Sequence, residues 1–262
     1  MNLNDVGTQL LFTTLPISVK KKDGAVVSGT AFFYSVPLPD KPGGSIPFLV
    51  TNYHLLSNVE SGYLILTGSK GAEPDVSKKL RVDFTGDILS NNYDSELDLA
   101  AIPIGGTLNL LQSQNTPVFF KAIQPEIIPN SEVIKGLLAI EEVTFAGYPS
   151  GIYDDVNSTP LIRKGITASP IWNDFKGKPV FVIDAGVYPG SSGSPVFIYN
   201  QGSYATTQGI TVGVRIYFLG IISSTFSGIG ANSSPYFIGL GTVIKSQKIK
   251  EFIDGIVKNI KV

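Results

Sequence analysis

Ser192, His54 and Asp98 are the side chains of this sequence whose types suit covalent acyl transfer. A serine hydroxyl is a poor nucleophile near neutral pH unless a base removes its proton. Histidine suits that task because its unperturbed pKa is roughly 6.5. The chain contains one histidine, so any serine that is activated in this way depends on His54.

The segment around Ser192 has the composition of a tight, exposed turn. Residues 184–195 read Asp-Ala-Gly-Val-Tyr-Pro-Gly-Ser-Ser-Gly-Ser-Pro and lie between two apolar runs that would anchor them. Gly190 and Gly193 permit backbone angles that other residues avoid, so that backbone N–H groups can face the oxyanion that acyl transfer creates. A flexible loop rich in serine and glycine is the alternative interpretation of this segment taken alone.

The surroundings of His54 and Asp98 fit a general base and the group that orients it. His54 follows the apolar run 48–53 and lies at the end of an expected strand, although a histidine in such a place is more often structural. Asp98 enters an apolar run in which an unpaired carboxylate would be costly to desolvate, so we expect it to be buried and to fix the imidazole tautomer. Asp94 and Glu96 lie in a polar stretch and are interpreted as turn and surface residues.

The chain order histidine, aspartate, serine excludes other hydrolase classes. An α/β-hydrolase places its histidine after the serine, and no histidine follows Ser192. The order of subtilisin requires an aspartate before the histidine; Asp5, Asp23 or Asp40 could supply one, but the expected alternation of strands and long helices is missing. One histidine and no cysteine leave only carboxylates as further strong zinc ligands. We therefore expect no metal and no other cofactor.

The composition is that of a globular protein with no electrostatic preference for polyanions. Apolar residues make up 43% and charged residues 16%, and the net charge is −1, so nucleic acid is excluded as the main partner. The longest basic run, residues 20–22, precedes Asp23-Gly24 and is interpreted as a solvated hairpin tip. The chain has no cysteine, no recognisable targeting signal and no apolar run of about 18 residues. We therefore expect no membrane partner and a cytoplasmic location.

Short runs rich in Val, Ile, Phe, Tyr and Thr, separated by 28 glycines and 17 prolines, predict an all-β fold. About a dozen strands suit two closed β-barrels. The predicted strands span residues 15–20, 25–36, 48–53, 62–66, 80–84, 97–103, 142–147, 161–168, 179–184, 195–199, 211–223 and 238–244.

The two expected barrels divide the chain near residue 125. Residues 1–125 contain the predicted base and its orienting carboxylate, and residues 126–262 contain the predicted nucleophile. The stretch 105–136 interrupts the strand pattern with Asn, Gln and Pro, and is therefore the expected connection between the barrels.

The end of the chain predicts a helix over residues 246–260, with Ser246 as its N-cap. Apolar residues recur there at three- and four-residue spacing, which gives the helix one apolar stripe. They are Ile249, Phe252, Ile253, Ile256, Val257 and Ile260. We expect this stripe to pack on the second barrel.

Three motifs of the chain resemble those of the chymotrypsin-like serine proteases, and more closely the bacterial branch that includes the HtrA proteases. Residues 51–54 (Thr-Asn-Tyr-His) resemble the histidine motif of that branch, and residues 98–100 (Asp-Leu-Ala) resemble its aspartate motif. Residues 190–195 (Gly-Ser-Ser-Gly-Ser-Pro) resemble the serine motif Gly-x-Ser-Gly-Gly-Pro. Weaker similarity, at residues 28–32, 145–151 and 239–252, extends the match from about residue 15 to 255. The resemblance implies two six-stranded antiparallel β-barrels followed by a C-terminal α-helix.

The resemblance also implies which groups bind the substrate. The backbone N–H groups of Gly190 and Ser192 would form the oxyanion hole. An extended peptide would pair with the strand at Ser223, Ser224 and Thr225. No acidic residue lies in the implied specificity pocket, so we expect small or medium apolar side chains before the cleaved bond. The residues that would bound this pocket are Gly186, Val187, Thr225 and either Gly241 or Thr242.

Three features depart from the pattern of the family. Ser194 replaces the second glycine of the serine motif, and its side chain would either crowd the turn or point to solvent. Ser191 stands where digestive members carry an aspartate that pairs with a newly cut N-terminus, and no matching Ile-Val-Gly-Gly start is present, so that route of activation is excluded. The HtrA-like proteins carry a peptide-binding PDZ domain after the protease, whereas this chain ends after its helix. We expect any regulation to act through a partner protein or through the loops 37–47 and 150–160.

These observations predict a serine endopeptidase that hydrolyses a protein or peptide substrate through an acyl-enzyme. A catalytically silent scaffold that binds a peptide or a partner protein is the alternative, and an esterase using the same site is a third hypothesis. A setting inside a bacterial cell, with one dedicated substrate protein, is a prediction that rests on the absent targeting signals and the absent cysteines.

Overall fold

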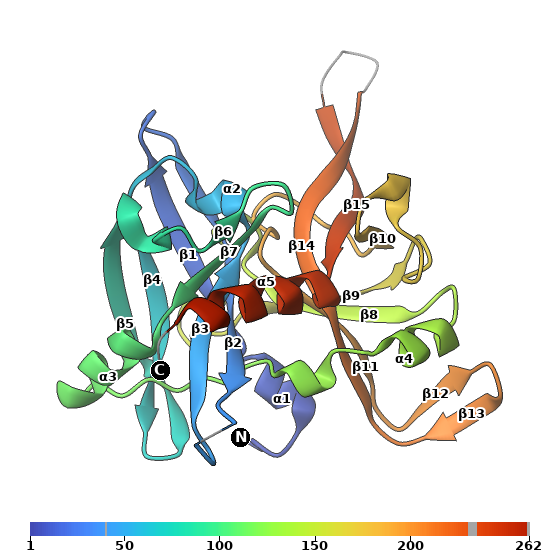
Figure 1. Cartoon of the computed structure of the whole chain (residues 1–262), viewed down its shortest axis with the longest axis horizontal. Helices are drawn as coiled ribbons and strands as arrows, with labels where there is room; N and C mark the ends of the chain where they lie inside the picture. Colours follow the sequence, from blue (N-terminus) through green and yellow to red (C-terminus); the bar gives the residue numbers. More distant parts are fainter. Residues whose placement is uncertain (40, 230–234, 261–262) are drawn as a thin grey trace.

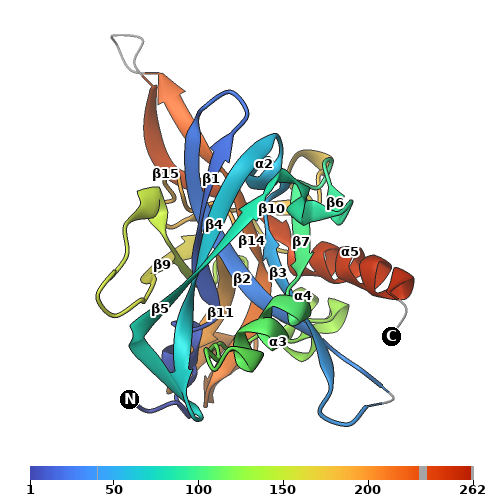
Figure 2. The same cartoon turned by 90° about the vertical axis from the view of Figure 1, so that its left-hand side faces the viewer.

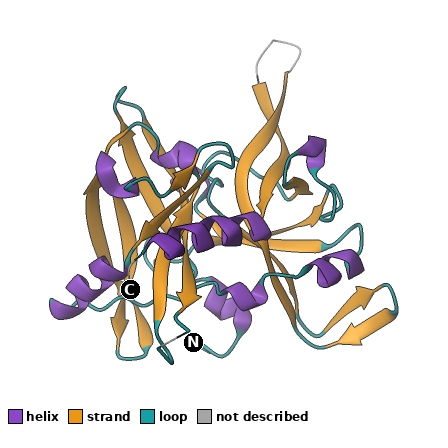
Figure 3. Cartoon of the chain, in the orientation of Figure 1, coloured by secondary structure: helices purple, strands orange, loops and turns teal. Residues whose placement is uncertain are grey.

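Two β-structures form most of the chain, and the C-terminal helix lies across both of them (Figure 1). The computed structural model describes residues 1–39, 41–229 and 235–260. Strands dominate the described chain, and the last helix is its longest (Figure 3). The predicted all-β fold with a C-terminal helix is therefore confirmed.

An antiparallel sheet of seven strands builds the first half, in the order β5-β4-β1-β2-β3-β7-β6; Figure 2 looks onto β5, β4 and β1. Its strands are β1 (Thr14–Lys21), β2 (Val26–Pro37), β3 (Ser45–Thr51), β4 (Val59–Lys70), β5 (Glu73–Thr85), β6 (Tyr93–Asp94) and β7 (Leu99–Pro103). The sequence predicts six strands here; the seventh is β6, a two-residue strand that pairs with β7. Alternation sets the faces: along β1, Leu15, Ile17 and Val19 are buried and the residues between them are partly exposed.

A closed barrel of six strands builds the second half, in the order β10-β15-β14-β11-β8-β9. Its strands are β8 (Glu142–Gly147), β9 (Leu161–Thr167), β10 (Val180–Asp184), β11 (Pro195–Asn200), β14 (Arg215–Ile229) and β15 (Pro235–Lys245). A separate hairpin of β12 (Ser203–Thr206) and β13 (Gly209–Val212) lies between β11 and β14 in the chain. The strand predicted over 211–223 is thus two elements, because Gly213, with φ +148°, interrupts it.

The stretch 105–136, predicted as the connection between the halves, contains three short helices: α3 (Gly105–Ser113), α4 (Ser131–Gly136) and the 3₁₀ helix η2 (Pro125–Ile127). The sequence did not predict these helices because none of them fully buries a side chain, so no apolar period marks them. The predicted division near residue 125 falls within this connection and stays a prediction. The other short helices are α1 (Val6–Leu10), α2 (Tyr53–Leu56), η1 (Gly86–Leu89), η3 (Pro149–Gly151) and η4 (Phe175–Gly177).

Helix α5 (Ser246–Asn259) agrees with the predicted C-terminal helix but starts differently. Ser246 is its first helical residue and Lys245 is the N-cap, which makes no side-chain capping bond. The Ser246 hydroxyl is buried and has no hydrogen-bond partner among the described residues. The prediction of Ser246 as N-cap is therefore wrong. Strand β15 ends at Lys245, one residue beyond the predicted strand end at residue 244, and the helix begins directly at Ser246.

The apolar stripe of α5 packs on both halves rather than on the second barrel alone. Ile249 and Ile253 are fully buried in a cluster that contains residues of both β-structures. The cluster includes Phe32, Phe48, Val50 and Leu99 from the first sheet and Phe197, Phe218, Ile221 and Ile244 from the barrel. The expected packing is corrected accordingly: α5 lies over the line where the two halves meet (Figure 1).

Candidate functional site

One open cleft between the two halves is lined by His54, Asp98 and Ser192. His54 and Asp98 come from segments of the first sheet, and Ser192 comes from the loop between β10 and β11 of the barrel. The fold therefore brings together the three residues that the sequence selected by type and order. Neither half carries all three groups.

His54 lies on the four-residue helix α2, directly after strand β3. Asp98 binds the beginning of this helix through two of its oxygen atoms. Its backbone carbonyl accepts a hydrogen bond from the Tyr53 N–H at 3.2 Å, and its Oδ1 accepts one from the His54 N–H at 2.9 Å. Asp98 thus satisfies N–H groups that a helix start leaves without an internal partner.

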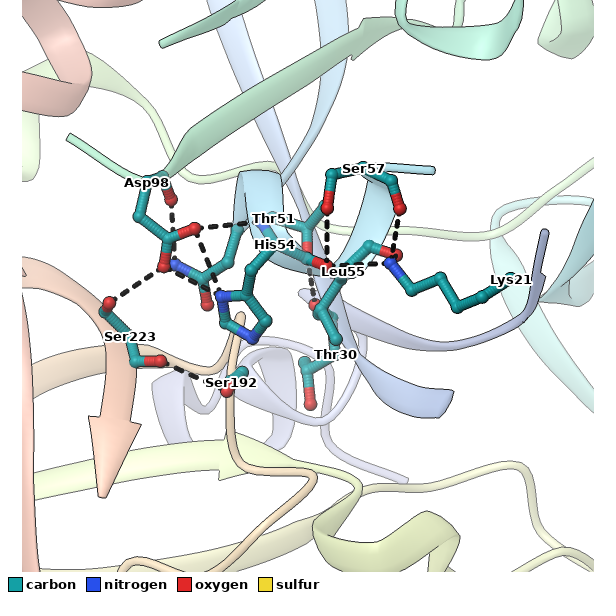
Figure 4. A network of polar contacts seen from close by, with 10 residues as sticks. Lys21, Thr30, Thr51, His54, Leu55, Ser57, Asp98, Ser192 and Ser223 are labelled. Atoms are coloured by element: carbon teal, nitrogen blue, oxygen red, sulfur yellow. Dashed lines mark hydrogen bonds and ion pairs between the residues drawn. The ribbon is translucent and has the colours of Figure 1, made fainter. Parts of the chain in front are cut away.

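The same carboxylate holds the imidazole ring of His54. Nδ1 lies 2.8 Å from Asp98 Oδ2 and 3.1 Å from Oδ1 (Figure 4). Since a carboxylate accepts hydrogen bonds, Nδ1 is the donor of this pair, and in the neutral tautomer with this proton Nε2 keeps a free lone pair. Ser223 Oγ donates a further hydrogen bond to Asp98 Oδ2 at 2.9 Å. The sequence predicted Ser223 only as a substrate contact. Its hydrogen bond to Asp98 could not be predicted, because the two residues lie far apart in the sequence.

Asp98 itself occupies a strained backbone conformation, with φ +56°. Left-handed angles are uncommon in residues other than glycine, and they concentrate at functional sites where surrounding contacts hold them. The side chain is 24% exposed, which is more than its place before an apolar run predicted, because the carboxylate opens onto the cleft. The apolar run behind it, in β7, is buried as expected.

Ser192 lies below the imidazole ring in Figure 4, and its hydroxyl donates a hydrogen bond to the Ser223 carbonyl oxygen at 3.2 Å. Among the described residues, no hydrogen bond joins Ser192 Oγ to His54. Because Nδ1 of His54 is bound to Asp98, only Nε2 is available to accept the serine proton. The Ser192 hydroxyl must therefore release the Ser223 carbonyl before it can donate to Nε2, and such catalytic contacts often tighten only when substrate binds.

The predicted oxyanion hole depends on the peptide between Pro189 and Gly190. Ser150, in the 3₁₀ turn η3, donates to the Pro189 carbonyl oxygen through its backbone N–H at 3.0 Å and through Oγ at 3.2 Å. In a trans peptide the N–H of Gly190 points away from that carbonyl. Within the described part of the chain, the N–H groups of Gly190 and Ser192 donate no hydrogen bond, so both are free to bind an anion.

The structure corrects the expectation for Ser194. Its side chain neither crowds the turn nor points to solvent: it is fully buried, and Oγ donates to Thr30 Oγ1 at 3.2 Å. The room comes from Gly147, where a Cβ atom would lie 2.0 Å from Ser194 Oγ. Ser191 is also fully buried, and its Oγ accepts a hydrogen bond from the Tyr188 N–H at 3.4 Å. Both serines therefore stabilise the turn from within.

The predicted substrate-binding residues divide into two groups. Ser223, Ser224 and Thr225 line the cleft beside Ser192, whereas Gly186, Val187 and Thr242 do not. Val187 is fully buried, and its side chain lies within 2.6 to 3.0 Å of the place where a Cβ atom of Gly241 would be. The side chain of Val187 therefore packs against Gly241 in the barrel core.

Both loops expected to regulate the site contain internal hydrogen bonds; in the loop 37–47 the Leu38 N–H donates to the Gly44 carbonyl oxygen at 2.9 Å. Residue 40 of the loop 37–47 lies outside the described residues. The loop 150–160 contains a bridge between Asp154 and Thr159, and Ser158 Oγ donates to the Val76 carbonyl oxygen of β5 at 3.3 Å. A regulatory role for either loop stays a prediction.

Within residues 1–39, 41–229 and 235–260, no group of three or more His, Cys, Asp or Glu side chains could hold a metal ion. None of the helices in these ranges is long and apolar enough to cross a membrane.

Comparison with known proteins identifies a family for most of the chain. The family described as a trypsin-like peptidase domain matches residues 29–204, a stretch that contains all three candidate residues. No curated protein matches the chain in sequence.

Solved structures agree with the fold. The HtrA-type protease AlgW, solved with a tripeptide, shares 15% sequence identity at a TM-score of 0.55; the match covers 96% of this chain and 62% of AlgW. The serine endoprotease from Yersinia pestis shares 15% identity at a TM-score of 0.53, with 98% and 67% of the two chains covered. This chain therefore spans less than two thirds of the length of AlgW. At 15% sequence identity, the similarity to these two structures shows a shared fold.

Proposed function

Because the chain belongs to the trypsin-like peptidase family, we propose that it is a serine endopeptidase. In this proposal Ser192 is the nucleophile, His54 is the general base and Asp98 orients the imidazole. The observation that carries the proposal is the position of His54. Its Nδ1 and its backbone N–H are both bound to Asp98, and its second ring nitrogen, Nε2, points toward Ser192 (Figure 4).

The proposed reaction follows from these positions. Nε2 of His54 accepts the proton of the Ser192 hydroxyl while Oγ attacks the peptide carbonyl carbon. The resulting oxyanion accepts hydrogen bonds from the N–H groups of Gly190 and Ser192. The imidazolium, stabilised by Asp98, then donates its proton to the leaving amine, and water hydrolyses the acyl-enzyme by the same steps.

The proposed substrate is an extended segment of a protein or peptide. Such a segment can add as a strand beside Ser223, Ser224 and Thr225, which line the cleft next to the nucleophile. The absence of an acidic residue among the predicted pocket residues supports a preference for small or medium apolar side chains before the cleaved bond. A peptide library measures this preference, and efficient cleavage after Lys or Arg would contradict it.

One observation favours a second candidate function, a silent scaffold that binds peptides. The Ser192 hydroxyl is bound to the Ser223 carbonyl, an acceptor that a bound peptide strand would use, and is not bound to His54. A scaffold could retain this arrangement without turnover. A cytoplasmic location and a regulatory protein partner stay predictions for either function.

A fluorophosphonate probe tests the proposal because it reacts only with an activated serine. We expect mass spectrometry to locate the adduct on Ser192 in the purified protein and to find none in the His54→Ala variant. Ser192→Ala should retain only the weak catalysis of binding and the oxyanion hole, roughly 10³- to 10⁴-fold over water. Absence of labelling in the natural sequence, together with binding of an extended peptide, would favour the scaffold.

A further inference from the structure

The ammonium group of Lys21 lies against the helix that carries His54. Its Nζ donates hydrogen bonds to three backbone carbonyl oxygens, those of His54 at 2.8 Å, Leu55 at 3.0 Å and Ser57 at 2.6 Å (Figure 4). These carbonyls belong to the end of α2, where a helix leaves its last C=O groups without internal partners. We propose that Lys21 is a positioning residue that holds His54 in its place for the proposed reaction, on which this inference rests.

The side chain of Lys21 reaches α2 because of its place in strand β1. Leu15, Ile17, Val19 and Lys21 share one face of the strand, and the three apolar members are buried. The pairing of β1 with β4 shifts register between Lys20 and Lys21 because β4 contributes one extra residue there, Glu60, so the alternation along β1 itself continues to Lys21. Lys20 lies on the opposite face, where it forms an exposed ion pair with Glu60 at 2.8 Å.

Helix α2 needs support at both ends because it contains only four residues. A helix of this length is not stable by its own hydrogen bonds. The Asp98 carboxylate binds its beginning and the Lys21 ammonium binds its end. A negative charge at the start of a helix and a positive charge at its end both interact favourably with the helix dipole. Asp98 and Lys21 therefore stabilise the same turn from its two ends.

The position of the helix decides the position of the imidazole. Asp98 binds the backbone N–H and Nδ1 of the same residue, so a displacement of the His54 backbone also displaces Nε2 relative to Ser192. A misplacement of about 1 Å can cost a reaction roughly 100-fold in rate. Burial lowers the pKa of Lys21 while the nearby Asp23 carboxylate raises it, which agrees with an ammonium that exchanges water for carbonyl oxygens.

The kinetic test compares Lys21→Met with Lys20→Met in the full chain, on any substrate that the enzyme turns over. Lys21→Met keeps most of the side-chain length and removes the donors, and we expect kcat to fall by about 10- to 100-fold with KM within twofold. Lys21→Arg restores positively charged N–H donors and should recover part of kcat. Lys20→Met, which removes only the exposed pair, should leave both constants unchanged.

A spectroscopic test separates this inference from the proposed function, because His54 is the only histidine in the chain. With ¹⁵N-labelled histidine, one set of imidazole resonances reports the Nδ1–H bond to Asp98 whether or not the protein is catalytic. We expect Lys21→Met to shift or broaden these resonances and Lys20→Met to leave them in place. Unchanged resonances in Lys21→Met, or a loss of kcat that only follows a loss of folded protein, would overturn the inference. Absence of activity in the natural sequence would instead contradict the proposed function.

Discussion

Ser223 contributes two different groups to the candidate site. Its hydroxyl donates to Asp98 Oδ2 at 2.9 Å, and its backbone carbonyl accepts from the Ser192 hydroxyl at 3.2 Å. The first contact fixes the plane of the carboxylate that binds His54. The second contact must break before Ser192 can give its proton to Nε2. One residue therefore couples the orientation of the base to the resting state of the nucleophile.

The Ser223→Ala substitution separates these two contacts because it removes the hydroxyl and keeps the carbonyl. A hydrogen bond to a charged group contributes about 1.5 to 3 kcal/mol, so we expect kcat to fall by at least about 10-fold. KM should change little because the strand that would pair with the peptide is intact. Steady-state kinetics measure both constants.

The matched control for Ser223 is its neighbour Ser224, which lines the same cleft and is exposed. Ser224→Ala should leave kcat unchanged. Equal kcat in Ser223→Ala and the natural sequence would show that the hydroxyl does not orient the Asp98 carboxylate.

At the residue scale, the sequence predicted side chains that can be recognised from their type and immediate neighbours. It did not predict side chains whose role depends on a partner far away in the sequence. Residue types and chain order selected Ser192, His54 and Asp98, which line one cleft. The burial of Ser194 depends on the space at Gly147, which lies 47 positions earlier and has no sequence signal of its own. Lys21 was interpreted as part of a solvated run of three lysines. The alternation along β1, however, places Lys21 on the face opposite to Lys20.

The turn η3 and the loop that carries Ser192 form one unit at the scale of elements. Gly190 has φ +86°, and a Cβ atom there would lie 2.2 Å from the Ser150 backbone nitrogen. The close approach lets Ser150 donate two hydrogen bonds to the Pro189 carbonyl. Glycine is therefore required at position 190 for its conformation and for its size.

The Gly190→Ala substitution should disturb the predicted oxyanion hole. Loss of one oxyanion donor costs roughly 10²- to 10³-fold in kcat, and we expect a loss of this size because the added methyl group must displace either Ser150 or the Pro189–Gly190 peptide. Kinetics and thermal unfolding should be measured on the same preparations.

Gly177→Ala provides the control for backbone strain. Gly177 has φ +73°, but a Cβ atom there would meet nothing within 4 Å. The left-handed conformation should cost each variant about 1 to 2 kcal/mol of stability, Gly190→Ala should lose more because of its contact with Ser150, and only Gly190→Ala should lose activity. A similar kcat in the two variants would argue against a role of this peptide in catalysis.

Alternation of apolar residues predicted the strands, and their boundaries depended on pairing that the sequence does not display. Strand β14 was expected over 211–223 and spans Arg215–Ile229, because it pairs with β15 beyond the barrel. Helices α3 and α4 bury no side chain fully and so left no periodic signal. The stripe of α5 was clear, but a stripe does not identify the surface that it covers.

At the scale of the whole molecule, the candidate site depends on contacts between the two halves. Tyr148, which follows β8, donates its backbone N–H to Thr30 Oγ1 at 3.1 Å and its hydroxyl to the Thr14 carbonyl oxygen at 3.2 Å. Both acceptors belong to the first sheet. Together with α5, these bonds fix the half that carries Ser192 against the half that carries His54.

Tyr148 and Tyr34 are both fully buried, and burial raises the pKa of each phenol well above its usual range. In the unfolded chain a tyrosine ionises near pH 10, whereas the folded protein keeps these two protonated. The unfolded state therefore binds fewer protons than the folded state at higher pH. The contribution of these residues to stability is complete below about pH 10 and is lost as the pH rises further.

Two substitutions test this dependence, with the free energy of unfolding measured in urea from pH 7 to pH 11. Tyr148→Phe loses a buried hydrogen bond and should cost about 1 kcal/mol at pH 7, whereas Tyr34→Phe should cost less because the Tyr34 hydroxyl has no hydrogen-bond partner among the described residues. Both variants should lose less stability than the natural sequence between pH 10 and pH 11, since each lacks one phenol that ionises on unfolding. Parallel pH profiles for all three proteins would mean that these phenols ionise in the folded state, and that alkaline unfolding begins elsewhere.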